Sequence, residues 1–279
     1  MTMHAKYLYL PLSSLLLAWL NACGQPYASE LQEGTEKHDK GTFHHVVHKA
    51  ETRGETNAGW LLGKHSFSFG EYYDPNKMHF GALRVLNDDR IDPMKGFRTH
   101  PHRNMEIITI PLGGVVEHQD NMGNEGVIKT GDVQIMSAGK GITHSEFNPS
   151  QTDTLRLLQI WVLPNKQDVT PRYQQINGIL KKEVRNEFKK LVAPNDSNAL
   201  FLYQNTVFSM GKFDKGNTYR YPVAFKGNGV YAFMIEGTAK LNGIPLNSRD
   251  AIGIWDTDSI LLETTTDTHI LFLDVPMLE

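Results

Sequence analysis

The chain has 279 residues, 40% of them hydrophobic and 10% aromatic, and carries a formal net charge of −3. This composition provides a sizeable buried core for one large β domain or two smaller ones, and the weakly acidic balance excludes a strongly basic nucleic-acid-binding surface. Cys23 is the single cysteine, which excludes an intramolecular disulfide.

The first predicted element is an apolar run at residues 7–20, directly after Lys6. It is shorter than the roughly 20 residues of a membrane-spanning helix and is typical of the apolar region of a signal peptide. The sequence LNAC at residues 20–23 resembles a bacterial lipobox, in which the cysteine is lipidated. We therefore expect a signal peptide at residues 1–22, a polar tether at 23–42 and export to the periplasmic side, with a lipidated Cys23 as membrane anchor. The alternative is a short buried helix or a frayed leader with an incidental cysteine.

From residue 43 onward, short apolar or alternating runs are separated by Gly, Asn, Asp and Pro, a pattern that predicts strands. Residues 169–198 change character, with two prolines and a charged run at 180–191 that indicates a solvated helix face. Strand patterns then resume, including a hairpin turn at Asn242-Gly243. The sequence thus predicts two stacked β-barrels or sandwiches, one at residues 43–168 and one at 169–279.

Two short motifs in the first half carry the chemistry. His100 and His102 are two residues apart, as are His144 and Glu146, and residues at this spacing share one face of a strand. If the two strands are neighbours, three imidazoles and one carboxylate converge, a donor set for one divalent transition metal with positions left open. The donor types leave Fe, Ni, Co, Mn, Cu(II) and Zn open. The second half contains one histidine after this cluster, His269, so it cannot repeat the site.

The amino-acid sequences around these motifs resemble those of a known family. GFRTHPHRNMEIITIPLGG at residues 96–114 resembles the first cupin motif, and GDVQIMSAGKGITHSEFN at 131–148 resembles the second. Together with GWLLGKHSFSFGEYYDP, EHQDNMGN and QIWVLPN, they are similar to the pirin family, most densely over residues 60–173.

The resemblance implies an all-β bicupin of two stacked jelly-roll barrels, in which only the N-terminal barrel (43–168) binds metal. It implies that His100, His102, His144 and Glu146 hold a divalent metal, Fe(II) in our prediction. Several pirin-like proteins are quercetin 2,3-dioxygenases, which open a flavonol ring with O2 and release CO, and Glu146 would be the catalytic base. We expect a flavonol-like aromatic substrate and a monomer. The alternatives are a non-catalytic redox sensor that acts through a protein partner, and a cupin isomerase or hydrolase that uses the metal as a Lewis acid.

For further residues near the motifs, the sequence leaves alternative roles open. Glu106 competes for the fourth ligand position, and the resemblance places it instead behind the ligands, where it would orient one of them. His118 either lines the site or is structural. Arg98 influences an anionic substrate if it points inward and has no functional role if it points outward. Pro111 predicts an edge strand or a bulge. The histidines of FHHVVH at 43–48 are predicted to be non-ligands.

Overall fold

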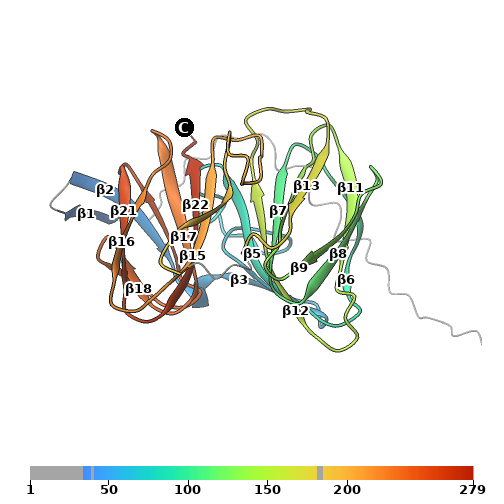
Figure 1. Cartoon of the computed structure of the whole chain (residues 1–279), viewed down its shortest axis with the longest axis horizontal. Helices are drawn as coiled ribbons and strands as arrows, with labels where there is room; N and C mark the ends of the chain where they lie inside the picture. The colour runs from blue at the N-terminus through green and yellow to red at the C-terminus, as the bar shows by residue number, and fades with distance from the viewer. Residues whose placement is uncertain (1–33, 39–40, 181–184, 279) are drawn as a thin grey trace, which may run out of the picture.

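The structure is a computed structural model that describes residues 34–38, 41–180 and 185–278. Within these ranges every regular element is a strand except one 3-10 turn, η2 (Ala50–Thr52). The strands form four sheets, and Figure 1 shows them as two barrels side by side. The predicted all-β architecture of two stacked barrels is therefore confirmed.

The N-terminal barrel consists of two sheets. Its seven-stranded inner sheet has the order β13 (Arg172–Ile176), β10 (Val133–Ser137), β7 (Glu106–Gly113), β12 (Leu155–Val162), β5 (Leu83–Ile91), β4 (Leu61–His65) and β3 (Gly54–Asn57). Its four-stranded outer sheet has the order β6 (Gly96–His102), β11 (Ile142–Phe147), β8 (Val115–Asp120) and β9 (Glu125–Lys129).

The C-terminal barrel repeats this arrangement. Its seven-stranded inner sheet has the order β1 (Gly34–His38), β2 (Gly41–His48), β20 (Ala251–Trp255), β17 (Asn228–Glu236), β22 (Thr268–Pro276), β15 (Val207–Phe213) and β14 (Lys189–Val192). Its four-stranded outer sheet has the order β16 (Thr218–Pro222), β21 (Ser259–Thr264), β18 (Ala239–Leu241) and β19 (Ile244–Leu246).

The largest hydrophobic core lies between the two inner sheets. On β12, Leu158 and Ile160 belong to this core, together with Phe208 and Leu271 of the C-terminal barrel. Because side chains alternate along a strand, the odd-numbered residues of β12 point the other way, into the N-terminal barrel. The same alternation on β5, β7 and β10 separates an interdomain face from a barrel-interior face, and the interior face carries the candidate site.

The two barrels exchange segments across the predicted boundary. β2, predicted as the start of the first barrel, pairs with β20 in the C-terminal inner sheet, and its Phe43 is buried in the interior of that barrel. β13, predicted in the second barrel, pairs with β10 in the N-terminal inner sheet. Residues 34–38, predicted as part of a flexible tether, pair with β2 as β1. Strands can pair whatever their order in the chain, and composition does not reveal their partners. The predicted boundary at residues 168–169 therefore assigned β2 and β13 to the wrong barrels.

The described end of the charged run at residues 180–191 does not have the predicted helical structure. Its last residues form strand β14 and not a helix, and Leu191 and Val192 are fully buried in the interdomain core. Burial against the neighbouring sheet overrides the weak helical preference of the charged residues. Local predictions with a turn or bulge mechanism are confirmed. Asn242 and Gly243 both have positive φ, as the hairpin turn requires, and Pro111 lies at a register shift between β7 and β12.

The C-terminal barrel interior is apolar. It is filled by a cluster that includes Phe213, Tyr221 and Phe272. Tyr221 stacks on Phe272, and Phe188 contacts all three rings. Among the described residues, both clusters of possible metal-binding side chains belong to the N-terminal barrel. The predicted signal peptide and Cys23 lie outside the described residues. Within the described ranges, the structure contains no helix long and apolar enough to cross a membrane.

Candidate metal centre

The two histidine motifs lie on neighbouring strands of the N-terminal outer sheet. β6 and β11 pair antiparallel, with His144 directly opposite His100 and Ile142 opposite His102. The three imidazole rings lie 4.5–4.9 Å apart between centroids. One potential ligand nitrogen from each ring lies within 4.8 Å of the others. The structure therefore brings together the three histidines that the sequence selected, with His144 buried and the other two half-buried.

A β-bulge in β6 orients the first of these histidines. Between the pairs His144–His100 and Glu146–Phe97, two residues of β6 face one residue of β11. The bulge leaves the Arg98 side chain exposed and aims its carbonyl oxygen at His100, whose Nδ1 donates a 2.7 Å hydrogen bond to it. This bond fixes the tautomer and leaves Nε2 of His100 as the acceptor atom for a metal. Arg98 thus acts through its backbone, and its charge points outward.

Glu146 is buried on the same strand as His144 and is held by two donors. The Thr109 hydroxyl donates to its Oε1 over 2.9 Å, and the Gln159 side-chain amide donates to its Oε2 over 2.6 Å. Burial raises the pKa of Glu146 to about 7, although both hydrogen bonds favour the ionised form. Glu146 forms a second group of possible ligands with His144 and His118, again with ligand atoms within 4.8 Å of one another.

Thr109 and Gln159, which the sequence analysis did not single out, both contact the carboxylate of Glu146. Each is a buried polar residue between apolar neighbours, within IITIP of β7 and LLQIW of β12. A buried polar side chain needs a hydrogen-bonding partner, so such an isolated residue signals an interior polar contact. The two residues are directly opposite in the register of β7 and β12, which places both donors side by side under Glu146.

Glu106 does not have the position that we predicted for it. Side chains alternate along β7, so Glu106 lies on the same face as Ile108, which belongs to the interdomain core. Ile107, which lies in the cluster beside the site, points to the opposite face. The carboxylate of Glu106 accepts a hydrogen bond from Ser137 and lies near the positive charge of Arg172. The assignment behind the metal ligands is therefore wrong, because the alternation along β7 directs Glu106 out of the barrel.

The histidines of FHHVVH lie on β2 in the other barrel and belong to neither cluster of possible ligands. The buried His48 is hydrogen-bonded through Nδ1 to the Tyr231 hydroxyl over 2.8 Å, which is a structural contact. His118, which the sequence left open, is buried at the candidate site, with its ring 5.2 Å from that of His144.

The electrostatics of the site suit a bound cation. Burial, followed by the influence of His100, lowers the pKa of His102 to about 3, and burial together with the neighbouring imidazoles lowers the pKa of His144. Neutral imidazole is the form that binds metal. Both ring nitrogens of His144 are buried and have no hydrogen-bond partner among the described residues. Such an orphaned pair is costly unless another ligand satisfies it, so these residues fit a divalent transition metal.

An aromatic and aliphatic wall stands beside the half-buried histidines. Trp161 packs edge-on against His102 with ring centroids 5.0 Å apart, and Phe69 packs edge-on against Trp161 at 5.5 Å. Both rings belong to a hydrophobic cluster with Val85, Met105, Ile107, Met136 and Ile142. The half-buried His102 therefore has an apolar and aromatic neighbourhood.

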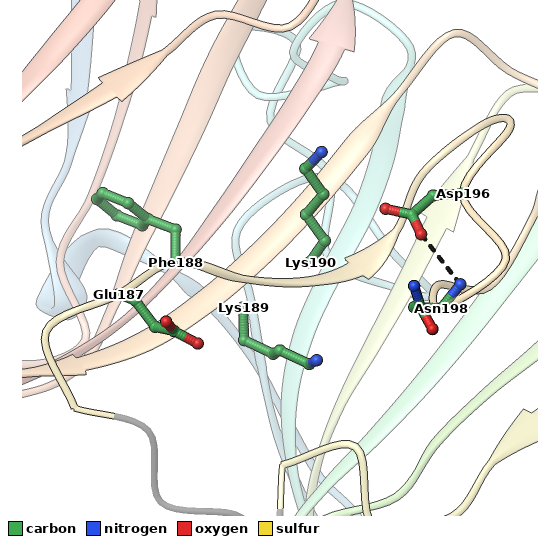
Figure 2. A pocket seen from close by; sticks show the side chains of 6 residues that line it. All are labelled: Glu187, Phe188, Lys189, Lys190, Asp196 and Asn198. Carbon is green, nitrogen blue, oxygen red and sulfur yellow. Dashed lines mark hydrogen bonds between the residues drawn. The ribbon is translucent and has the colours of Figure 1, made fainter.

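A separate surface pocket lies along β14 in the C-terminal barrel (Figure 2). Lys189 and Lys190 leave the strand on opposite sides there (Figure 2). Asp196 accepts a hydrogen bond from the backbone N–H of Asn198, as in an ordinary turn. The pocket therefore has no converging set of functional groups.

Fold and site together define a class of protein: a two-barrel cupin whose N-terminal barrel carries a cluster of imidazoles and one carboxylate, while the C-terminal barrel has an apolar interior. The Pirin family model matches residues 46–162, and the model described as quercetinase C-terminal cupin domain matches residues 191–275. The chain belongs to the pirin family.

This chain aligns with nearly the whole length of its relatives. It is 41% identical over 232 residues to the quercetin 2,3-dioxygenase of Escherichia coli K12, a match that spans 82% of this chain and 98% of the relative. It is 39% identical over 223 residues to a pirin-like protein of Caulobacter vibrioides, covering 79% and 95% of the two chains.

A solved relative contains a metal. The crystal structure of the bacterial pirin YhhW from E. coli in complex with nickel(II) has a TM-score of 0.79 and 39% identity, covering 84% of this chain and 100% of that one. This relative and the cluster of donors support a divalent metal at the candidate site.

Proposed function

We propose that this protein is a metal-dependent dioxygenase that opens the ring of a quercetin-like flavonol with O2 and releases CO. The observation that carries the proposal is the convergence of His100, His102 and His144, with the buried carboxylate of Glu146 on the same face of β11 as His144. The relatives named quercetin 2,3-dioxygenase supply the reaction type.

The proposed ligands are the three histidines and Glu146. Imidazoles and a carboxylate suit Fe(II), our proposed metal, and also accommodate Ni, Co, Mn, Cu or Zn. When bound, the metal would supply Lewis-acid stabilisation of the flavonol 3-oxygen and a path for electrons between the substrate and O2. The hydrogen bond from His100 to the Arg98 carbonyl would keep that imidazole oriented throughout.

Glu146 is the proposed base. In the metal-free site, burial raises the pKa of Glu146 to about 7, so the surroundings of this carboxyl favour its acceptance of a proton. Thr109 and Gln159 would hold the carboxylate so that one oxygen faces the 3-hydroxyl of the substrate. Trp161 and Phe69 would bind the flat ring system and exclude water from the reacting face.

The test is CO release from quercetin in air, with purified protein stripped of metal and reloaded in turn with Fe(II), Ni(II), Mn(II) and Cu(II). We expect CO with at least one metal and its loss in Glu146→Gln. Protein that binds each metal but releases no CO would contradict the dioxygenase proposal and favour the redox-sensing alternative.

We also propose export, with Cys23 as the lipid attachment site. The support is the apolar run at residues 7–20 followed by LNAC. Mass spectrometry of the protein from membranes of an expressing bacterium should show a mature N-terminus at acylated Cys23. A soluble product that retains residues 1–22 would refute this proposal.

A further inference from the structure

His118 lies in the same row of side chains as the proposed ligands. It is on β8, which pairs with β11, and it stands directly opposite Glu146 in that register. Val116 and His118 are the buried residues of β8, so its alternation directs His118 into the barrel. The β6–β11–β8 sheet thus carries ligand-type side chains on all three neighbouring strands.

The surroundings of His118 are those of a prepared metal ligand. Its Nε2 lies 3.5 Å from Oδ2 of Asp120, a carboxylate fixed by the backbone N–H groups of Met122 and Asn124. Histidine ligands of metals characteristically direct their second nitrogen at a carboxylate or carbonyl. Both ring nitrogens of His118 are buried, and neither has a hydrogen-bond partner among the described residues. A buried imidazole with unsatisfied nitrogens beside two other possible ligands calls for a further partner, such as a metal ion.

We propose that His118 is a fifth protein donor and forms, with His144 and Glu146, a second metal position that overlaps the first. This inference rests on the metal site of the proposed function and is independent of the substrate. The two positions share His144, whose neutral ring has one lone pair for a metal, so one ion per chain occupies either position. The family's two motifs do not include His118, whose role follows from its register opposite Glu146.

The test removes the first position and asks whether the second remains. Ni(II) is titrated, against a competing chelator, into the full chain carrying His100→Ala and His102→Ala, and into the same protein with His118→Ala added. We expect the double variant to retain one weakened Ni(II) site per chain. Adding His118→Ala should weaken it by at least about tenfold more. Adding His118→Gln, which keeps the side-chain volume, should weaken Ni(II) binding as His118→Ala does. The matched control is His79→Ala, which removes an exposed histidine and should leave the affinity of the double variant unchanged.

Two results would overturn the proposal: no Ni(II) binding by the double variant, or equal affinity with and without His118. Circular dichroism of each variant confirms that the barrels are folded. These readouts are binding measurements, so they stand even if the protein releases no CO from quercetin. Conversely, the wild-type protein could release CO while the triple variant binds Ni(II) as tightly as the double variant. That result would leave the dioxygenase proposal intact and refute the second metal position.

Discussion

Gln159→Leu is the most direct probe of how the barrel prepares Glu146. The substitution removes the amide that donates to Oε2 over 2.6 Å and leaves the Thr109 hydroxyl on Oε1. Leucine has nearly the same size, and Gln159 lies in a strand whose neighbours are buried and apolar, so the barrel should tolerate it. Glu146 is 3% exposed, so water cannot replace the lost donor.

The size of the effect follows from the energy of the bond. A hydrogen bond to a buried charged group contributes about 1.5–3 kcal/mol, which corresponds to a rise of roughly one to two pH units in the pKa of the carboxyl. The pKa of Glu146 starts at about 7. Proton competition at pH 7 should therefore weaken metal binding by roughly fivefold to fiftyfold in the variant. The defect should shrink as the pH rises and the carboxyl ionises.

The assay is Ni(II) affinity against a competing chelator at several pH values between 6 and 9. Gln134→Leu is the matched control, because Gln134 lies on the neighbouring strand opposite Thr109 and makes no hydrogen bond to Glu146. Unchanged affinity at pH 7 would refute the reasoning. A defect of equal size at pH 7 and pH 9 would show that Gln159 positions the carboxylate without stabilising its charge.

Three further predictions follow from the same geometry. His102→Ala should weaken Ni(II) affinity, measured against a competing chelator, with little change in the unfolding transition, while Glu106→Gln should keep the wild-type affinity because Glu106 faces the interdomain core; wild-type affinity in His102→Ala would contradict the ligand assignment. Arg98→Ala should change Ni(II) affinity by less than roughly twofold, because only its carbonyl is used and a backbone contact survives the substitution; a large loss would show that the charge matters. The stability of the metal-free protein, measured by urea unfolding, should fall as the pH drops from about 6.5 toward 4. Eight described imidazoles have lowered pKa values, so each takes up its proton at a lower pH in the folded protein than in the unfolded chain. Four carboxyls with raised pKa values oppose the trend, but they are fewer, so the unfolded chain binds more protons in this range. Stability that rises on acidification would refute this balance.

The sequence by itself determined the features that depend on local spacing. The two-residue spacing within His-x-His and His-x-Glu places each pair on one face of any strand, whatever surrounds it. The Asn242-Gly243 turn follows equally from local backbone preference, because both residues tolerate positive φ. The scarcity of histidine after residue 144 already indicated that the second barrel lacks the site.

The tertiary structure alone decided which strands meet and which face of each strand points inward. Local spacing cannot reveal that Glu106 turns toward the other barrel, that β2 joins the second barrel, or that His118 stands opposite Glu146. Each of these depends on register between segments far apart in the chain, and a shift of one residue would exchange the two faces of a strand. The donors were visible in the sequence, and long-range pairing selected which of them share the barrel interior.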